Sequence, residues 1–176
     1  MASSRSSDVL SRLVGPAYAI AFLFALEPIV DTFAQVWPPV PGNPSWRFGL
    51  VGVGSNYLIS ILFGLFLFGA VAATQWHRRT LRVLAVLDLL VAVALIGALL
   101  TFALDALQLR PGIPSGNAQA LRTFDIGAEK AVLKYLLSTV AALWMGLACW
   151  VAARGMKNAK GDEDVPRLVG QQAEKR

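Results

Sequence analysis

Four long apolar stretches dominate this chain of 176 residues and limit what it can fold into. Each holds about 20 or more mostly apolar residues, the length of helix that crosses the hydrocarbon core of a bilayer. The sequence therefore predicts an all-α integral membrane protein, a four-helix bundle. We expect one transmembrane domain at residues 13–153, with spans at about residues 13–33, 48–76, 81–105 and 126–153.

The basic residues predict the orientation of these spans. Residues 1–12 form a polar N-terminal tail, and the charged residues 154–176 lack an apolar period, which predicts a disordered tail. Most of the 16 Lys and Arg residues lie in the two tails and the turn at residues 75–82, namely Arg5, Arg12, Arg78, Arg79, Arg82, Arg154, Lys157, Lys160, Arg167, Lys175 and Arg176. Lys and Arg concentrate on the cytoplasmic side, so we expect both termini in the cytoplasm.

The same distribution bears on location and partners. The net charge of +5 comes from residues beside the apolar blocks, where they set topology. Nucleic acid is therefore not an expected partner. We expect a multi-pass protein of a bacterial inner (plasma) membrane whose partners are the lipid bilayer and other membrane proteins or a second copy.

Five charged residues lie at one predicted depth, near the outer boundary of the spans. A helix rises 1.5 Å per residue, so counting from the basic ends places Glu27, Asp31, Asp105, Lys130 and Lys134 at this level. We expect Glu27 or Asp31 to pair with Lys134, and Asp105 with Lys130. The alternatives are charges solvated one by one and a ligand or proton site, because an acid inside a membrane is a functional candidate.

Asp88 differs from these five because no other charged residue of the spans shares its depth. We expect its side chain to point into the bundle, toward Tyr18, a Ser or Thr, or a backbone group. Protonation is the alternative, since desolvation disfavours a carboxylate. Asp88 then either makes a buried packing contact or has a functional role, in which it docks a partner or carries a proton.

A stripe of small and mildly polar residues follows one predicted face of the second span: Gly49, Gly52, Asn56, Ser60 and Gly64. Small residues at this spacing let helices approach closely. The stripe predicts packing within the chain, or a homodimer face as the alternative.

The chain lacks the sequence patterns of known catalytic and metal sites. It contains one His and one Cys, and it has no P-loop, HExxH or nucleophile-elbow pattern. We therefore expect no catalytic residues, no metal and no cofactor.

The second span resembles the corresponding segment of one family. The stretch WRFGLVGVGSNYLISILFGLFLFGA at residues 46–70 follows a Pro-rich loop, and the third span ends in DALQLR at residues 105–110. This layout, which covers residues 13–153 in outline, resembles the HpsJ-like cyanobacterial membrane proteins associated with polysaccharide secretion and exosortase loci. The resemblance implies an accessory membrane protein and gives no catalytic residues to carry over. It also makes a thylakoid membrane the alternative to the inner membrane as the location.

Three classes of function follow from these features. The first is a small accessory or scaffold protein that docks partner membrane proteins, in polysaccharide export or protein sorting. The second is a small transporter or proton-coupled component that uses Glu27, Asp31 and Asp88. The third, a membrane enzyme acting on a lipid or isoprenoid, has the least support because no catalytic motif is present.

Overall fold

The structure, a computed structural model, describes the backbone of residues 2–173 and the side chains of residues 13–156. Over that range it contains helices and no strand, which confirms the all-α prediction. The elements are α1 (Ala2–Gln35), α2 (Pro44–Gly54), α3 (Leu58–Thr74), α4 (Arg78–Leu109), the 3₁₀ turn η1 (Arg110–Gly112) and α5 (Ala118–Ala173).

Three segments are long and apolar enough to cross a membrane: Leu13–Gln35, Arg78–Gly112 and Ala118–Met156. The helices α2 and α3 pass the same criterion only when they are taken together, and they meet at an angle of 51°. The chain therefore has three candidate spans, or four if the bent pair counts as one. The second predicted span, at about residues 48–76, thus consists of two helices rather than one.

The break between α2 and α3 has a local cause in three consecutive polar residues. The hydroxyl of Ser55 donates to the carbonyl of Gly52 at 2.7 Å. The amides of Asn56 and Tyr57 bond the carbonyls three residues earlier, each at 3.0 Å. Ser and Asn side chains compete with helical hydrogen bonds, so the helix tightens, ends and starts again in a new direction.

The start of α2 is also fixed locally. Asn43 accepts a hydrogen bond from the amide of Ser45 at 2.8 Å, and Pro44 occupies the first helical position. Both choices suit a helix N-terminus. The indole of Trp46 donates to the carbonyl of Val36 at 2.7 Å, which closes the Pro-rich loop between α1 and α2.

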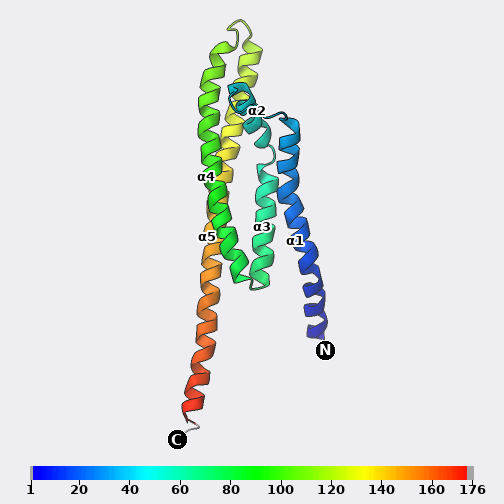
Figure 1. Cartoon of the computed structure of the whole chain (residues 1–176), viewed down its shortest axis with the longest axis vertical. Helices are drawn as coiled ribbons and strands as arrows, with labels where there is room; N and C mark the ends of the chain where they lie inside the picture. The colour runs from blue at the N-terminus through cyan, green and yellow to red at the C-terminus, as the bar shows by residue number, and fades with distance from the viewer. Residues whose placement is uncertain (1, 174–176) are drawn as a thin grey trace.

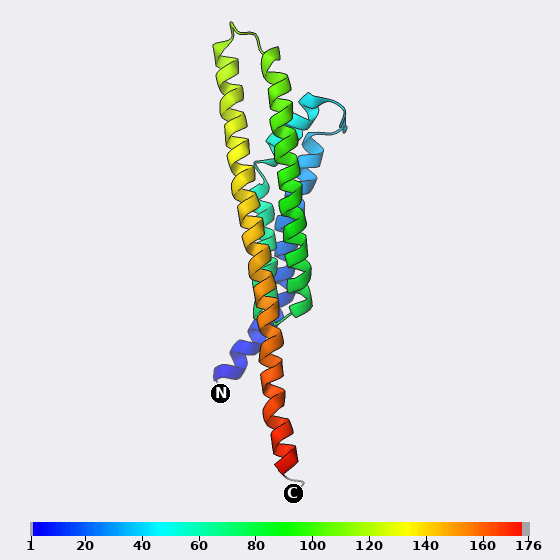
Figure 2. The ribbon, with the colours of Figure 1, turned by 90° about the vertical axis from the view of Figure 1, so that its left-hand side faces the viewer.

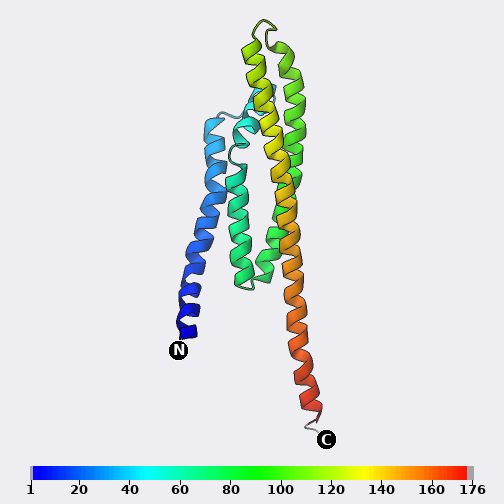
Figure 3. The same ribbon diagram turned by 180° about the vertical axis from the view of Figure 1, so that it is seen from behind.

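The helices form two antiparallel pairs joined through α3 (Figure 1). One pair is α1 with α3, and the other is α4 with α5, which pack along their shared length. The helix α3 also contacts α4 and α5, whereas α1 has its principal contacts with α3 and α2. This open arrangement leaves one side of α1 without a helical neighbour (Figure 3).

Both chain ends lie at the same end of the molecule, and the loops after α1 and α4 lie at the other (Figure 2). We call these the terminal end and the loop end. One apolar cluster packs around Phe102 and Tyr135 toward the loop end, and a second packs around Leu81 and Ala153 toward the terminal end. Large apolar side chains outside these clusters are exposed along α1, α4 and α5, a surface compatible with a membrane protein.

Both terminal helices extend further than the sequence suggests. The helix α1 begins at Ala2, inside the predicted N-terminal tail, and α5 continues to Ala173, across most of the tail predicted to be disordered. An existing helix lengthens without forming a new nucleus, which favours such continuations. Residues 174–176 of that predicted tail lie outside the described residues.

Candidate functional site

Polar side chains from α1 and the helix break converge near the loop end. The carboxylate of Asp31 accepts a hydrogen bond from the amide nitrogen of Gln35 at 2.9 Å. The phenol of Tyr57 donates to the same carboxylate oxygen. Gln35 donates a second bond to the Tyr57 hydroxyl at 2.8 Å. Asp31 thus accepts hydrogen bonds from two uncharged donors and ties α1 to the break.

The helix α5 reaches the same break from the other side. The ammonium of Lys134 donates to the side-chain oxygen of Asn56 at 2.7 Å. The adjacent Tyr135 hydroxyl donates to the carbonyl of Val51 in α2 at 3.2 Å. We call Asp31, Gln35, Asn56, Tyr57 and Lys134 the break cluster. Its hydrogen bonds connect α1 and α5 to the point where the second candidate span changes direction.

The predicted pairing of Glu27 or Asp31 with Lys134 is wrong. Lys134 bonds an amide oxygen, and Asp31 bonds a phenol and an amide. The break in the second span causes this, because it turns Asn56 and Tyr57 into the space where the two charges were expected to meet. Glu27 is exposed, and among the described side chains it has no hydrogen bond or ion pair.

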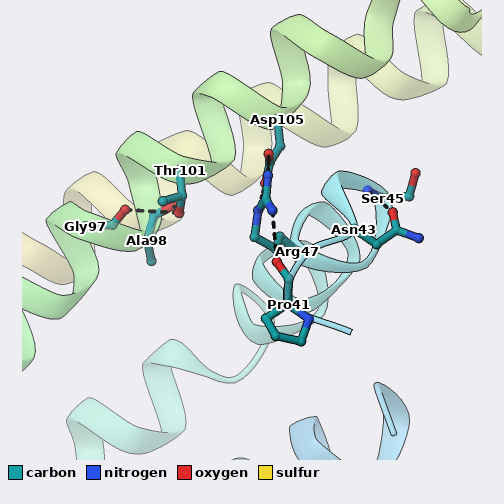
Figure 4. A network of polar contacts seen from close by, with 8 residues as sticks. All are labelled: Pro41, Asn43, Ser45, Arg47, Gly97, Ala98, Thr101 and Asp105. Carbon is teal, nitrogen blue, oxygen red and sulfur yellow. Dashed lines mark hydrogen bonds and ion pairs between the residues drawn. The ribbon is translucent and has the colours of Figure 1, made fainter. Parts of the chain in front are cut away.

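A second polar contact joins α2 to α4 at the loop end (Figure 4). The guanidinium of Arg47 donates to both oxygens of Asp105, at 3.0 Å from Nε and 2.5 Å from Nη2. The Asp105 side chain is only 2% exposed, and that of Arg47 is 33% exposed. Two-pronged, charge-assisted bonds of this kind are among the stronger ones in proteins. Arg47 also donates to the carbonyl of Pro41 at 2.9 Å, so it anchors the Pro-rich loop.

This contact corrects the predicted pairing of Asp105 with Lys130. Lys130 is exposed on α5, whereas Arg47 comes from α2, which folds across α4. Sequence reasoning gave Arg47 no partner and missed this role. The available signal was its position beside Trp46 at the predicted outer boundary, the same depth as Asp105.

Asp88 points into the helix interface, as predicted. Among the described residues, one of its two carboxyl oxygens has no polar partner. Its side chain is 1% exposed, and Oδ1 has no hydrogen bond. It packs tightly on α5, where a Cβ at Gly146 would lie 3.2 Å from the Asp88 Cβ. Tyr18 is not its partner, because the Tyr18 hydroxyl lies 3.0 Å from Nδ1 of His77. A buried carboxyl oxygen without a partner is costly, and among the described side chains Asp88 is the residue that has one.

The stripe of small residues does not form one continuous face. Gly49 and Gly52 belong to α2, and a Cβ there would meet nothing within 4 Å. Asn56 lies in the break, and Ser60 donates to the carbonyl of Phe24 at 3.4 Å. Gly64 lies directly against the backbone of α1. The α3 part of the stripe therefore packs within the chain.

Together these contacts hold four helices to one another at the loop end. Among the described residues, no group of three His, Cys, Asp or Glu side chains could hold a metal ion. The break cluster and the Arg47–Asp105 pair cross-link α1, α2, α4 and α5 at one end of the bundle. No protein-family model matches this chain, and neither a curated protein nor a solved structure matches it.

Proposed function

We propose that this chain is a multi-pass membrane protein that acts as an accessory or scaffold subunit and docks another membrane protein on the open side of α1. Its termini lie on the cytoplasmic side of a bacterial inner membrane. The alternative is a thylakoid membrane if the chain is cyanobacterial. The loop end then faces outward. The resemblance to the HpsJ-like proteins extends the proposal to polysaccharide export or protein sorting.

Two observations support the membrane placement. The candidate spans expose large apolar side chains that water would not favour, such as Val140 at 65% and Trp144 at 72%. Both chain ends lie at the same end of the molecule (Figure 1), the end that carries most of the Lys and Arg residues. The positive-inside rule assigns such a side to the cytoplasm.

The docking proposal is carried by Glu27 and the face of α1 on which it lies. One face of α1 packs on α3 and buries Ala21 and Pro28. Another face, spaced by three and four residues, holds Ile20, Leu23, Glu27 and Val30, all exposed. This second face, the open face of α1, combines a lipid-like surface with one carboxylate.

A carboxylate on such a face calls for a partner. Glu27 lies one helical turn deeper than Asp31 by the rise of the helix. A charged side chain costs about 2.5–3.5 kcal/mol at the centre of a bilayer, and less toward the interface. A neighbouring helix with a Lys, an Arg or another strong donor at this depth would remove that cost. The proposed partner is therefore a transmembrane helix with a donor side chain in its outer half.

Site-specific photo-crosslinking in intact membranes tests this proposal. A photoreactive residue at Leu23 should give a discrete crosslinked product, which Glu27→Gln weakens and Glu27→Lys abolishes. The matched control is the same residue at Leu137 on α5, which is 62% exposed and does not lie on α1. A product at Leu23 that is unchanged by Glu27→Lys would contradict the proposal, as would equal products at Leu23 and Leu137.

A small transporter or proton-coupled component is the second candidate, and Asp88 is the observation that favours it. A buried carboxyl with an unpartnered oxygen is typical of proton-carrying positions in membranes, and broken helices are typical of transporters. Purified protein in vesicles should then show a proton or solute flux that Asp88→Asn eliminates while the protein still folds. Normal folding and no flux in the unmodified protein would leave the docking role as the explanation.

A further inference from the structure

A groove runs between α4 and α5 near the loop end, on a part of the molecule that the docking proposal does not use. Its volume is about 620 Å³, and its floor is apolar, with Leu107 on α4 and Leu133 and Leu136 on α5. Three charged residues line its upper part: Arg110, Asp125 and Glu129. The groove is therefore amphipathic along its length, with the charges at the loop end.

The charged residues have unused hydrogen-bonding capacity. Arg110 donates to both oxygens of Asp125, at 2.9 Å from Nε and 3.0 Å from Nη2. A guanidinium has five N–H groups, so three remain available. Glu129 lies one turn after Asp125 on α5 and is exposed, and it has no hydrogen bond or ion pair among the described side chains. One end of the groove thus offers both donors and acceptors.

The depth of the groove matches one leaflet of a bilayer. Arg110 follows Asp105, the predicted outer boundary, by five residues, or about 8 Å along a helix. Headgroups occupy roughly 5–8 Å on each side of the hydrocarbon core. Leu136 lies about 16 Å further down α5 than Asp125 by the same rise. The charged end lies at headgroup depth, Leu107 lies near the outer boundary, and Leu133 and Leu136 lie at the depth of the acyl chains.

We propose that this groove binds one zwitterionic phospholipid with an ethanolamine headgroup. Arg110 donates its free N–H groups to the phosphate, while Asp125 and Glu129 accept hydrogen bonds from the ammonium group. One acyl chain lies along Leu107, Leu133 and Leu136. Two carboxylates and one guanidinium disfavour an anionic lipid, because a phosphate without an attached ammonium would face both carboxylates. The inference rests on the membrane placement in the proposed function.

Native mass spectrometry of the full chain tests this selection. The protein is reconstituted in vesicles of equal parts phosphatidylethanolamine and phosphatidylglycerol, extracted in mild detergent, and analysed for retained lipid. We expect one phosphatidylethanolamine per chain, preferred over phosphatidylglycerol by about tenfold, which corresponds to about 1.4 kcal/mol. Equal retention of the two lipids, or retention of neither, would overturn the proposal.

Three variants separate a built site from lipid that merely surrounds the protein. Glu129→Gln should reduce the preference severalfold while leaving the Arg110–Asp125 pair intact, and Arg110→Gln should abolish it. Arg122→Gln is the matched control, because Arg122 is exposed on α5 and does not line the groove. The selection is refuted if Glu129→Gln retains lipids as Arg122→Gln does. Crosslinking from α1 reports on docking independently, so failure of lipid selection and failure of docking are distinguishable.

Discussion

A single methyl group added at Gly64 would test how α1 packs on α3. A Cβ at this position would lie 2.8 Å from the Ala21 carbonyl oxygen and 2.8 Å from the Ala25 amide nitrogen. Ordinary contacts of this kind begin at 3.4 Å. Both neighbours are backbone atoms and cannot rotate away. The variant Gly64→Ala must therefore push α1 outward by about 0.6 Å, the difference between these distances.

The cost of this displacement can be bounded. Overpacking a well-packed interface costs about 1–3 kcal/mol, and a backbone clash that no rotamer relieves belongs in the upper half of that range. Alanine regains about 1 kcal/mol over glycine in helix propensity. The net loss in the free energy of unfolding for Gly64→Ala should be about 1–2 kcal/mol.

Reversible unfolding in mixed micelles with increasing sodium dodecyl sulfate, followed by circular dichroism, measures this loss. Gly97→Ala on α4 is the matched control, because a Cβ there would meet nothing within 4 Å. That variant should be neutral or stabilised by up to about 1 kcal/mol. If Gly64→Ala is as stable as Gly97→Ala, then α1 does not pack on α3 as described.

Two further predictions concern the polar contacts of the loop end and use the same unfolding assay. Arg47→Met leaves the Asp105 carboxylate buried and unpaired and should cost about 3 kcal/mol. The double variant Arg47→Met/Asp105→Leu should recover most of that loss, and strictly additive losses would contradict a direct pair. Tyr57→Phe removes the donor to Asp31 and should cost about 1 kcal/mol, with faster hydrogen exchange at the helix break. Tyr18→Phe, at the other end of the bundle, is its control and should leave exchange at the break unchanged.

The helical class and the approximate spans could be predicted from the sequence because they follow from apolar length alone. About 20 apolar residues have few ways to satisfy their backbone in lipid other than a helix. The same reasoning placed Asp31, Asp105 and Lys134 near one level, and the structure brings each of them into the contacts of the loop end. Depth was predictable because it depends only on position along a helix.

The partners of these residues could not be predicted in the same way. Pairing depends on which faces meet, and that depends on the direction of α2. A change of 51° after Gly54 brings Arg47 onto Asp105 and Asn56 onto Lys134. The residues that cause the change, Ser55 and Asn56, have helix propensities that differ only slightly from those of many residues within helices. Sequence pattern alone gives no angle for such a break.

Asp88 shows a different limit. Its burial follows from its place on the inner face of α4, and the sequence pattern of that helix predicts this burial. Its environment depends on Gly146, which lies 58 residues later in the sequence and lets α5 approach within contact distance. A close approach between distant segments leaves no periodic signal in either one.

The contact between α2 and α4 also has a consequence for how the chain is made. A ribosome delivers α1, α2 and α3 before α4, since synthesis runs from the N-terminus. The Arg47 side chain therefore emerges 58 residues ahead of Asp105, and α2, with 11 residues, is too short to cross a bilayer by itself. During that interval α1 and α3 can pair through Gly64, while Arg47 of α2 does not yet have Asp105 to pair with. Asp105 then ties α2 to α4, and Lys134 and Tyr135, which follow later in the sequence, add the contacts of α5 with Asn56 and Val51.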